Sequence, residues 1–148
     1  MDASNRKPVF ILLAGLLVLL LVFLLQANIR QLLAELQAMP ARQLLQAGND
    51  AKWLDRDKVY AEGIGWIDRA LAMQPDNPEY HEIRGRLLLD RCRHWDDVER
   101  WDEKRQCWQQ ALDSLRLAVA GNNQWPYAWA NLLLAKYRLL QFDDEFYQ

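Results

Sequence analysis

The sequence predicts an all-α protein, with one N-terminal transmembrane helix followed by a short solenoid of antiparallel α-hairpins. Three observations carry this prediction. The chain of 148 residues has 17 consecutive residues without a polar side chain near its start, residues 9–25. Beyond residue 50, no segment alternates apolar and polar side chains with the period of two that marks a half-buried strand. One pattern of large and small side chains also recurs 48 residues further along the chain.

Length and charge exclude some classes of protein. A chain of 148 residues can form one small domain plus an appendage, but not two full domains. The 18 Lys and Arg residues nearly balance the 20 Asp and Glu residues, which gives a net charge of −2. A nucleic-acid binder would carry a concentrated basic surface. We therefore expect no nucleic-acid partner.

The apolar run is the first predicted element. At about 1.5 Å per residue it gives roughly 26 Å of helix, and its neighbours extend it toward the ~30 Å hydrocarbon core of a bilayer. A cleaved signal peptide is the alternative, but its apolar core is usually about 7–15 residues long and ends in small residues. Here Leu25 is followed by Gln-Ala-Asn, which is a poor cleavage site. We therefore expect an uncleaved transmembrane helix over residues 9–28, in contact with the lipid bilayer.

The flanking charges predict the orientation of this helix. Arg6 and Lys7 precede the span, whereas Arg30 alone follows it closely. Positive residues favour the cytoplasmic side. Residues 1–8 are therefore assigned to the cytoplasm, and the chain after about residue 28 to the other side of the membrane.

Residues 29–49 are predicted to form a juxtamembrane helix and a connector. Pro40 should end or kink this helix, and the segment 48–50 has the composition of a turn with an N-cap. We expect the apolar side chains of the helix to pack on the chain's own domain, with a foreign helix as the alternative. Five of them recur at helical spacing, namely Ile29, Leu32, Leu33, Leu36 and Met39.

The helical domain, residues 50–148, contains the recurring pattern. Large and small side chains at these intervals describe one face of a helix that packs closely on a neighbour. The first copy is Tyr60, Gly63, Ile67, Ala70 and Leu71, and the second copy is Trp108, Ala111, Leu115, Ala118 and Val119. Glycine costs about 1 kcal/mol relative to alanine inside a helix. Gly63 and Gly65 therefore indicate close helix contact.

The first copy, which ends at Pro75, resembles the second helix of a tetratricopeptide (TPR) repeat. Residues 80–88, with Gly85 at the small position, resemble the first helix of the next repeat, and Trp129 with Leu132 resembles that element again. The resemblance covers roughly residues 57–148. It implies a short TPR-like solenoid.

The spacing of the two copies predicts a long hairpin. Phe142 lies 34 residues after Trp108, which is the ordinary repeat length of the family, so an offset of 48 residues leaves 14 extra. Fourteen residues make nearly four helical turns, so we expect two helices that each run about two turns beyond their neighbours, with the bend near residues 95–102. A mobile loop is the alternative. In this hairpin Cys92 and Cys107 lie on opposing helices, where they could form a disulfide or remain two separate buried thiols.

A wider pattern is similar to a bacterial family, the small anchored TPR-like proteins of the VpsP type in exopolysaccharide biosynthesis. It combines the anchor, the sequence Asn77-Pro78-Glu79-Tyr80, and the tryptophan-rich stretch 125–132 that leads to Phe142. The resemblance implies a bacterial inner-membrane location and a periplasmic domain. It also implies a multi-pass membrane partner, such as a polysaccharide polymerase, ligase or export component.

Two sets of side chains are candidate partner-binding surfaces. The first is a polar stripe that TPR-like folds present on their concave side, with a merely solvated face as the alternative; its members are Glu79, Glu82, Arg86 and Asp90. The second is an apolar groove at the C-terminal end that another chain would complete, unless a short stub folds back over it. Its members are Leu132, Leu133, Leu139, Leu140, Phe142 and Phe146.

Tryptophans form a third candidate site. Trp66, Trp108 and Trp129 occupy core positions of the repeats, whereas Trp95, Trp101 and Trp125 do not. Exposed tryptophans anchor interfaces or stack on sugar rings. The second trio would therefore serve a protein interface or a glycan, with core or cap packing as the alternative.

No pattern in the chain indicates catalysis. His81 and His94 lack the spacing of a zinc site, and Ser4 and Ser114 are the only serines. We expect no enzyme activity, cofactor or metal. The sequence favours a non-catalytic membrane-anchored scaffold that binds and positions a membrane partner. The alternatives are a periplasmic chaperone-like accessory of protein translocation and a glycan-binding module.

Overall fold

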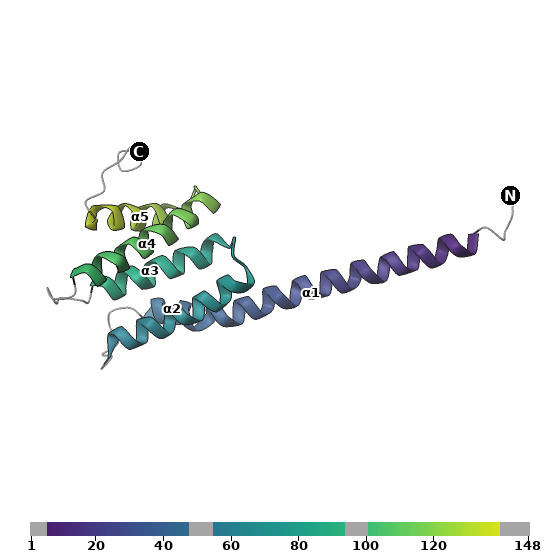
Figure 1. Ribbon diagram of the computed structural model, residues 1–148, viewed down its shortest axis with the longest axis horizontal. Helices are drawn as coiled ribbons and strands as arrows, with labels where there is room; N and C mark the ends of the chain where they lie inside the picture. Colours follow the sequence, from purple (N-terminus) through teal and green to yellow (C-terminus); the bar gives the residue numbers. More distant parts are fainter. Residues whose placement is uncertain (1–5, 48–54, 94–100, 140–148) are drawn as a thin grey trace.

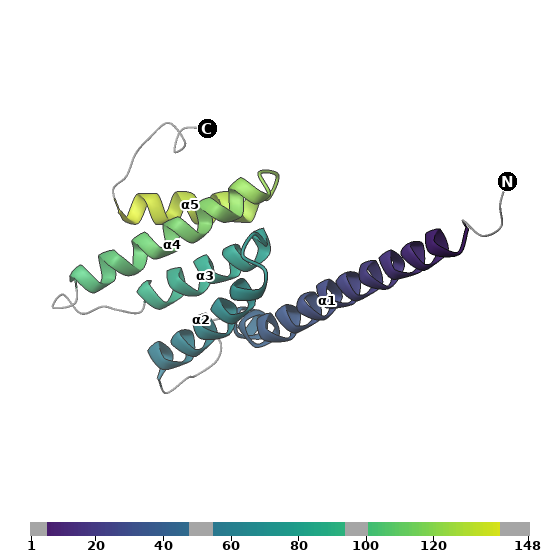
Figure 2. The ribbon, with the colours of Figure 1, turned by 45° about the vertical axis from the view of Figure 1, so that its right-hand side comes forward.

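The computed structural model of the chain describes residues 6–47, 55–93 and 101–139. These residues form five helices, which are α1 (Arg6–Ala47), α2 (Arg56–Met73), α3 (Pro78–Arg93), α4 (Trp101–Gly121) and α5 (Pro126–Arg138). No strand occurs within these three ranges. The predicted all-α fold is therefore confirmed. Helices α2–α5 and the end of α1 pack side by side, while the rest of α1 extends from this domain as a rod (Figures 1 and 2).

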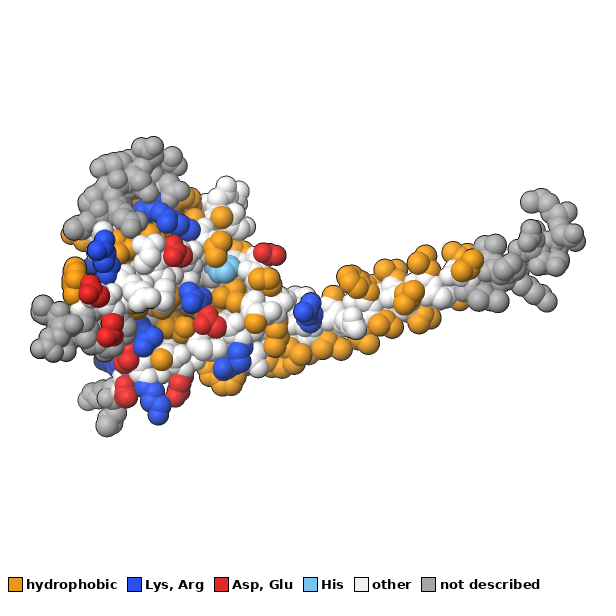
Figure 3. Space-filling model, viewed as in Figure 1, with side chains coloured by type: hydrophobic (Ala, Val, Ile, Leu, Met, Phe, Trp, Pro, Cys, Tyr) orange, Lys and Arg blue, Asp and Glu red, His pale blue; other side chains and the backbone are white. Residues whose placement is uncertain are grey.

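The rod is an apolar helix. With 42 residues, α1 is about 63 Å long, and its side chains are exposed from Leu12 to Leu33. Hydrophobic side chains follow the rod, whereas charged side chains gather on the domain (Figure 3). In the part of the chain that the structure describes, α1 is the one helix long and apolar enough to cross a membrane. The expected candidate transmembrane helix is confirmed.

The sequence predicted that Pro40 would either end or kink the helix. Helix α1 does not end there. It continues to Ala47 and becomes the first helix of the packed domain. A proline inside a helix costs roughly 3 kcal/mol, because a hydrogen bond is lost and the ring crowds the preceding turn. Packing on both sides of the proline offsets this cost. Ala38 and Ala41 are fully buried, and Leu44 packs against the core.

The face that α1 turns to the domain is not the predicted one. Ala34, Ala38 and Ala41 have no exposed surface, and the small alanine side chain lets α2 approach the α1 backbone closely. The five predicted side chains lie on the opposite face and remain exposed, by 48% for Ile29, 62% for Leu32, 43% for Leu33, 53% for Leu36 and 52% for Met39. The expectation that they pack on the chain's own domain is wrong. We call these five residues the apolar stripe.

The recurring faces of α2 and α4 form the centre of the stack. Each helix packs on the next, and α1 with α3 and α3 with α5 also touch. The residues of both copies are buried, apart from the partly buried Leu71. A methyl group added at Gly63 would lie 2.6 Å from Leu44 Cδ2, and one added at Gly85 would lie 2.6 Å from Leu115 Cγ. A methyl group added at Gly65 would lie 3.9 Å from Arg69 Nη1, at the end of a flexible side chain. The expectation of close helix contact at Gly65 is therefore wrong.

Within the described residues, the hairpin of α3 and α4 is extended at the start of α4. Helix α4 has 21 residues against 13 in α5, which is about two extra turns, but α3 has 16 and is shorter than α2 with 18. The expected extension is found for α4, whereas for α3 it concerns residues after Arg93, which lie outside the described residues. The predicted bend lies outside the described residues, except for its last two residues, which begin α4.

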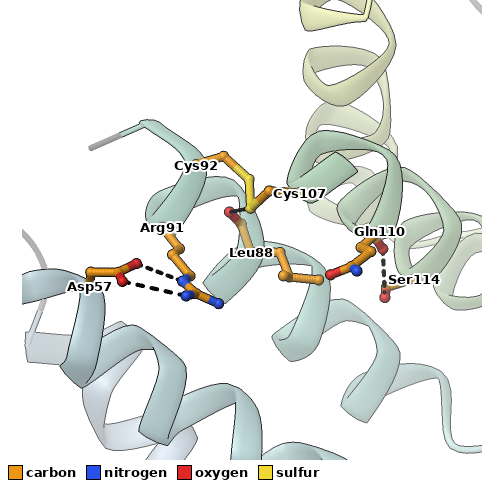
Figure 4. Close-up of a disulfide and its surroundings, with 7 residues drawn as sticks. All are labelled: Asp57, Leu88, Arg91, Cys92, Cys107, Gln110 and Ser114. Atoms are coloured by element: carbon orange, nitrogen blue, oxygen red, sulfur yellow. Dashed lines mark hydrogen bonds and ion pairs between the residues drawn. A yellow bond between two sulfur atoms is a disulfide. The ribbon is translucent and has the colours of Figure 1, made fainter. Parts of the chain in front are cut away.

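A disulfide joins the two helices of this hairpin. Cys92 and Cys107 lie with their Cα atoms 5.9 Å apart and their sulfurs bonded (Figure 4). Of the two arrangements considered for these cysteines, the structure has the bridge. Nearby, Arg91 Nε donates to Asp57 Oδ1 at 2.7 Å, which links α3 to α2.

Candidate interaction surfaces

The apolar stripe is an extended, exposed apolar surface of α1 outside the predicted span. Successive members are one or three residues apart, and all five project from one side of α1, roughly 180° from the buried alanines. Met39 lies 11 residues beyond the predicted end of the span, which corresponds to about 16 Å along the helix axis. The stripe therefore continues the apolar surface of the candidate span well beyond its predicted end.

The predicted polar stripe of α3 is partly used by the chain itself. Glu79 Oε1 lies 2.8 Å from Arg42 Nη2, and Arg42 also pairs with Glu35. Tyr80 Oη donates to Glu35 Oε1 at 2.9 Å. The hydrogen bond from Arg42 lowers the pKa of Glu35, and burial raises the pKa of Tyr80. This network fastens α3 to α1 near the end of the apolar stripe.

Glu82, the second member of the polar stripe, is buried. Only 4% of the residue is exposed, because α5 covers it, with Asn131 Nδ2 donating to Glu82 Oε1 at 3.5 Å. Arg86 Nε lies 3.6 Å from the same oxygen. Burial raises the pKa of the Glu82 carboxyl. Arg86 and Asp90 keep part of their surface exposed, so the stripe is a continuous open face only in its second half.

Sequence reasoning did not identify the partners of these carboxylates. Glu35 and Arg42 are seven residues apart, which is close to two helical turns, and this spacing was the available signal. Tyr80 and Asn131 could not be found in this way, because their contacts join helices that are distant in the sequence.

A cavity of about 580 Å³ opens where α3 ends, α4 begins and α5 ends. We call it the distal cavity. Its lining combines four cationic side chains with two indoles and one leucine, namely Arg93, Lys104, Arg105, Arg138, Trp101, Trp108 and Leu139. Trp101, one of the predicted interface or glycan tryptophans, is 62% exposed. The Arg138 guanidinium lies 5.8 Å from the centre of the Trp108 ring. The cations come from three helices, so no local sequence motif predicts that they lie together.

The other tryptophans considered in the sequence analysis differ in exposure and in their contacts. Trp125 is half-buried against the core, and Trp95 lies outside the described residues. Trp129 is half-buried, and its indole nitrogen donates to the Asn123 carbonyl at 2.8 Å. Trp66 is 37% exposed beneath Arg69, 4.1 Å from the centre of its ring. The expectation that Trp66 belongs to the core is wrong, because none of the five described helices buries this face of α2.

Only half of the predicted C-terminal groove lies within the described residues. Leu132 is fully buried in the core, and Leu133 and Leu139 are half-buried. Leu132 therefore does not line an open surface. The remaining members of the predicted groove, Leu140, Phe142 and Phe146, lie outside the described residues.

Within the described ranges, no group of three or more His, Cys, Asp or Glu side chains is arranged to hold a metal ion. No protein-family model matches the chain, and neither curated proteins nor solved structures show a significant match to it.

Proposed function

We propose that this chain is a non-catalytic, membrane-anchored accessory protein that positions a partner membrane protein. In this proposal α1 crosses the membrane and its apolar stripe receives a helix of the partner. The exposure of the stripe carries the proposal. Five large apolar side chains of α1, each about half exposed, lie outside the predicted span. Four of them lie on the side of α1 that faces away from the packed domain, and Ile29 also borders the cleft beside Met73.

The size of the stripe fits a helix as its occupant. Completing the burial of five half-exposed apolar side chains would contribute on the order of 5 kcal/mol, which is enough to favour association of helices already held in one bilayer. Spacings of three and four residues are those by which one helix packs against another. A partner helix could follow the stripe from the span up to Met39.

The location is proposed from the flanking charges and from the family resemblance. The charges favour a helical domain on the non-cytoplasmic side of the membrane. The resemblance suggests that this membrane is a bacterial inner membrane and that the domain is periplasmic. The disulfide supports the periplasmic side, because disulfides persist in oxidising compartments and are rare in the cytosol. The resemblance suggests that the partner is a multi-pass polymerase, ligase or export protein of polysaccharide biosynthesis.

Site-specific photo-crosslinking in cells would test this function. A photoreactive residue at Leu36 should crosslink to a multi-pass membrane protein, whereas one at the exposed Gln110 of α4 should not. Replacing Leu32 and Leu36 by serine should remove the co-purifying partner. Leu117→Ser is the matched control, because Leu117 is a leucine of similar exposure, 54%, on α4. Crosslinks from Leu36 only to a second copy of this chain, or unchanged co-purification, would contradict the proposal.

A second candidate function rests on the distal cavity. Its exposed Trp101 could stack on a sugar ring while the surrounding Arg and Lys side chains pair with carboxylates, which suits an acidic oligosaccharide. Titrating the protein with uronate-containing oligosaccharides while following tryptophan fluorescence would test this. Trp101→Ala should abolish the response, and Trp66→Ala is the control, since Trp66 is also a partly exposed indole beside an arginine. An unchanged fluorescence response in Trp101→Ala would exclude the distal cavity as the oligosaccharide-binding site.

A further inference from the structure

The end of α2 lies beside the predicted boundary of the span. Helix α2 runs antiparallel to α1, with Arg69 Nε donating to Gln37 Oε1 at 3.0 Å. One turn later Met73 and Gln74 face residues 23–30 of α1 across a cleft of about 600 Å³. These α1 residues are the ones where the apolar span gives way to polar side chains. The α2–α3 turn is therefore close to the level at which α1 would leave the hydrocarbon core.

The α4–α5 turn lies at the same end of the domain. A methyl group added at Gly121 would come within 2.8 Å of Pro78 Cβ, so the two turns are in direct contact. Both views show these turns on the side of the domain from which the rod of α1 extends (Figures 1 and 2). We call residues 74–77 and 121–127 the rod-side end of the domain.

The chemistry of the rod-side end differs from that of the opposite end. Asp76 is its single charged residue, and most of the others are amides or aromatic rings. Tyr127 is 74% exposed in the first turn of α5. Side chains of a helix lean toward its N-terminus, so Tyr127 leans toward this end. The opposite end has the four cations of the distal cavity.

We propose that the rod-side end rests in the headgroup region of the bilayer, with phospholipid filling the cleft between α1 and Met73. The inference rests on the proposed anchoring by α1. Tyr and Trp side chains concentrate at membrane–water interfaces, because their rings are apolar and their tips are polar. In the cleft, Phe23, Ala27 and Met73 offer apolar contacts to an acyl chain. Arg30 offers a cation to the lipid phosphate.

Fluorescent probes on the full-length protein, reconstituted in phospholipid vesicles, would test this contact. The native cysteines are bonded to each other, so a thiol probe labels only an introduced cysteine. Asn123→Cys places the probe on the rod-side end, Lys58→Cys at the opposite end of the domain, and Leu20→Cys within the span. All three residues are exposed. The vesicles contain lipids with a nitroxide quencher either on the headgroup or deep in the acyl chain.

We expect the headgroup quencher to reduce the fluorescence of the probe at Asn123 several-fold more than that of the probe at Lys58. The deep quencher should mainly reduce the fluorescence of the probe at Leu20. If the Asn123 probe behaves like the Lys58 probe while the Leu20 probe is quenched, the lipid contact is refuted and the anchor stands. An unquenched Leu20 probe would refute the anchor and this inference together.

A pair of tyrosine variants tests the role of the aromatic side chain. Tyr127→Ser should weaken headgroup quenching of the Asn123 probe. Tyr137→Ser should not, because Tyr137, 55% exposed, lies at the other end of the same helix. Equal effects of the two variants would overturn the assignment of Tyr127 to the interface.

Discussion

The close approach of α3 and α4 at Gly85 makes a quantitative prediction. An added methyl group would lie 2.6 Å from Cγ and 2.8 Å from Cδ2 of Leu115, whereas carbon atoms in contact prefer about 3.5–4.0 Å. The neighbour must therefore move by about 1 Å. Cγ is the branch point of a fully buried side chain, so it cannot swing aside. Overpacking of this kind costs about 1–3 kcal/mol, against about 1 kcal/mol gained in helix propensity.

The same substitution at Gly65 is the matched control. Only the flexible end of Arg69 lies near, at 3.9 Å, so Gly65→Ala should gain the propensity of about 1 kcal/mol without a packing cost. The difference between the two variants cancels the propensity and isolates the packing cost, which should be about 1–3 kcal/mol. Gly63→Ala should fall between them, since its nearest neighbour is a terminal methyl group of the half-buried Leu44.

Denaturant unfolding of the full-length protein in detergent micelles, followed by tryptophan fluorescence, measures these free energies. Equal effects of Gly85→Ala and Gly65→Ala would refute the close approach of α3 and α4. A large loss of stability in Gly65→Ala would instead show that this face of α2 is covered.

Two further predictions concern stability. Replacing both Cys92 and Cys107 by alanine should lower the free energy of unfolding by about 3 kcal/mol, because the bridge spans 15 residues; an unchanged denaturation midpoint would contradict this. Burial raises the pKa of Glu82, so the folded state holds this proton more tightly than the unfolded chain does. The ionised carboxylate therefore destabilises the fold as pH rises through the raised pKa, and has no such effect below its ordinary pKa. Glu82→Gln should accordingly stabilise the protein at neutral pH but not in acid, as compared by melting curves at both pH values; equal stabilisation at both would refute the buried carboxylate.

The helical stack was predictable because its signal is local and repeated. Gly85 and the two copies of the large–small pattern are buried where helices meet, as their spacing indicated. The role of α1 was not predictable in the same way. Both of its faces are periodic, and hydrophobicity alone favours the leucine face over the alanine face. Packing selected Ala34 and Ala38, because small side chains permit the close approach of α2.

The candidate sites were less predictable than the fold. The sequence singled out Trp101, which lines the distal cavity, but the neighbouring Arg93 and Arg138 come from helices far apart in the chain. It also singled out Glu82 as accessible to a ligand, whereas α5 covers it. Charge at a helical position does not reveal whether a later helix will pack above it. Such nonlocal contacts require the assembled stack.

Because α1 is continuous, the proposed span and the domain should move as one rigid unit, and this can be tested by insertion. Each residue inserted after Arg30 rotates the domain by about 100° and lifts it by about 1.5 Å relative to the span. Two alanines would turn the stripe by about 200° from the partner helix, so co-purification of the partner should be lost. Seven alanines restore the phase to within about 20° but lift the domain by about 10 Å. They should therefore retain the partner while releasing the Asn123 probe from the headgroups. If both insertions behave alike, the phase of α1 does not couple the partner to the domain.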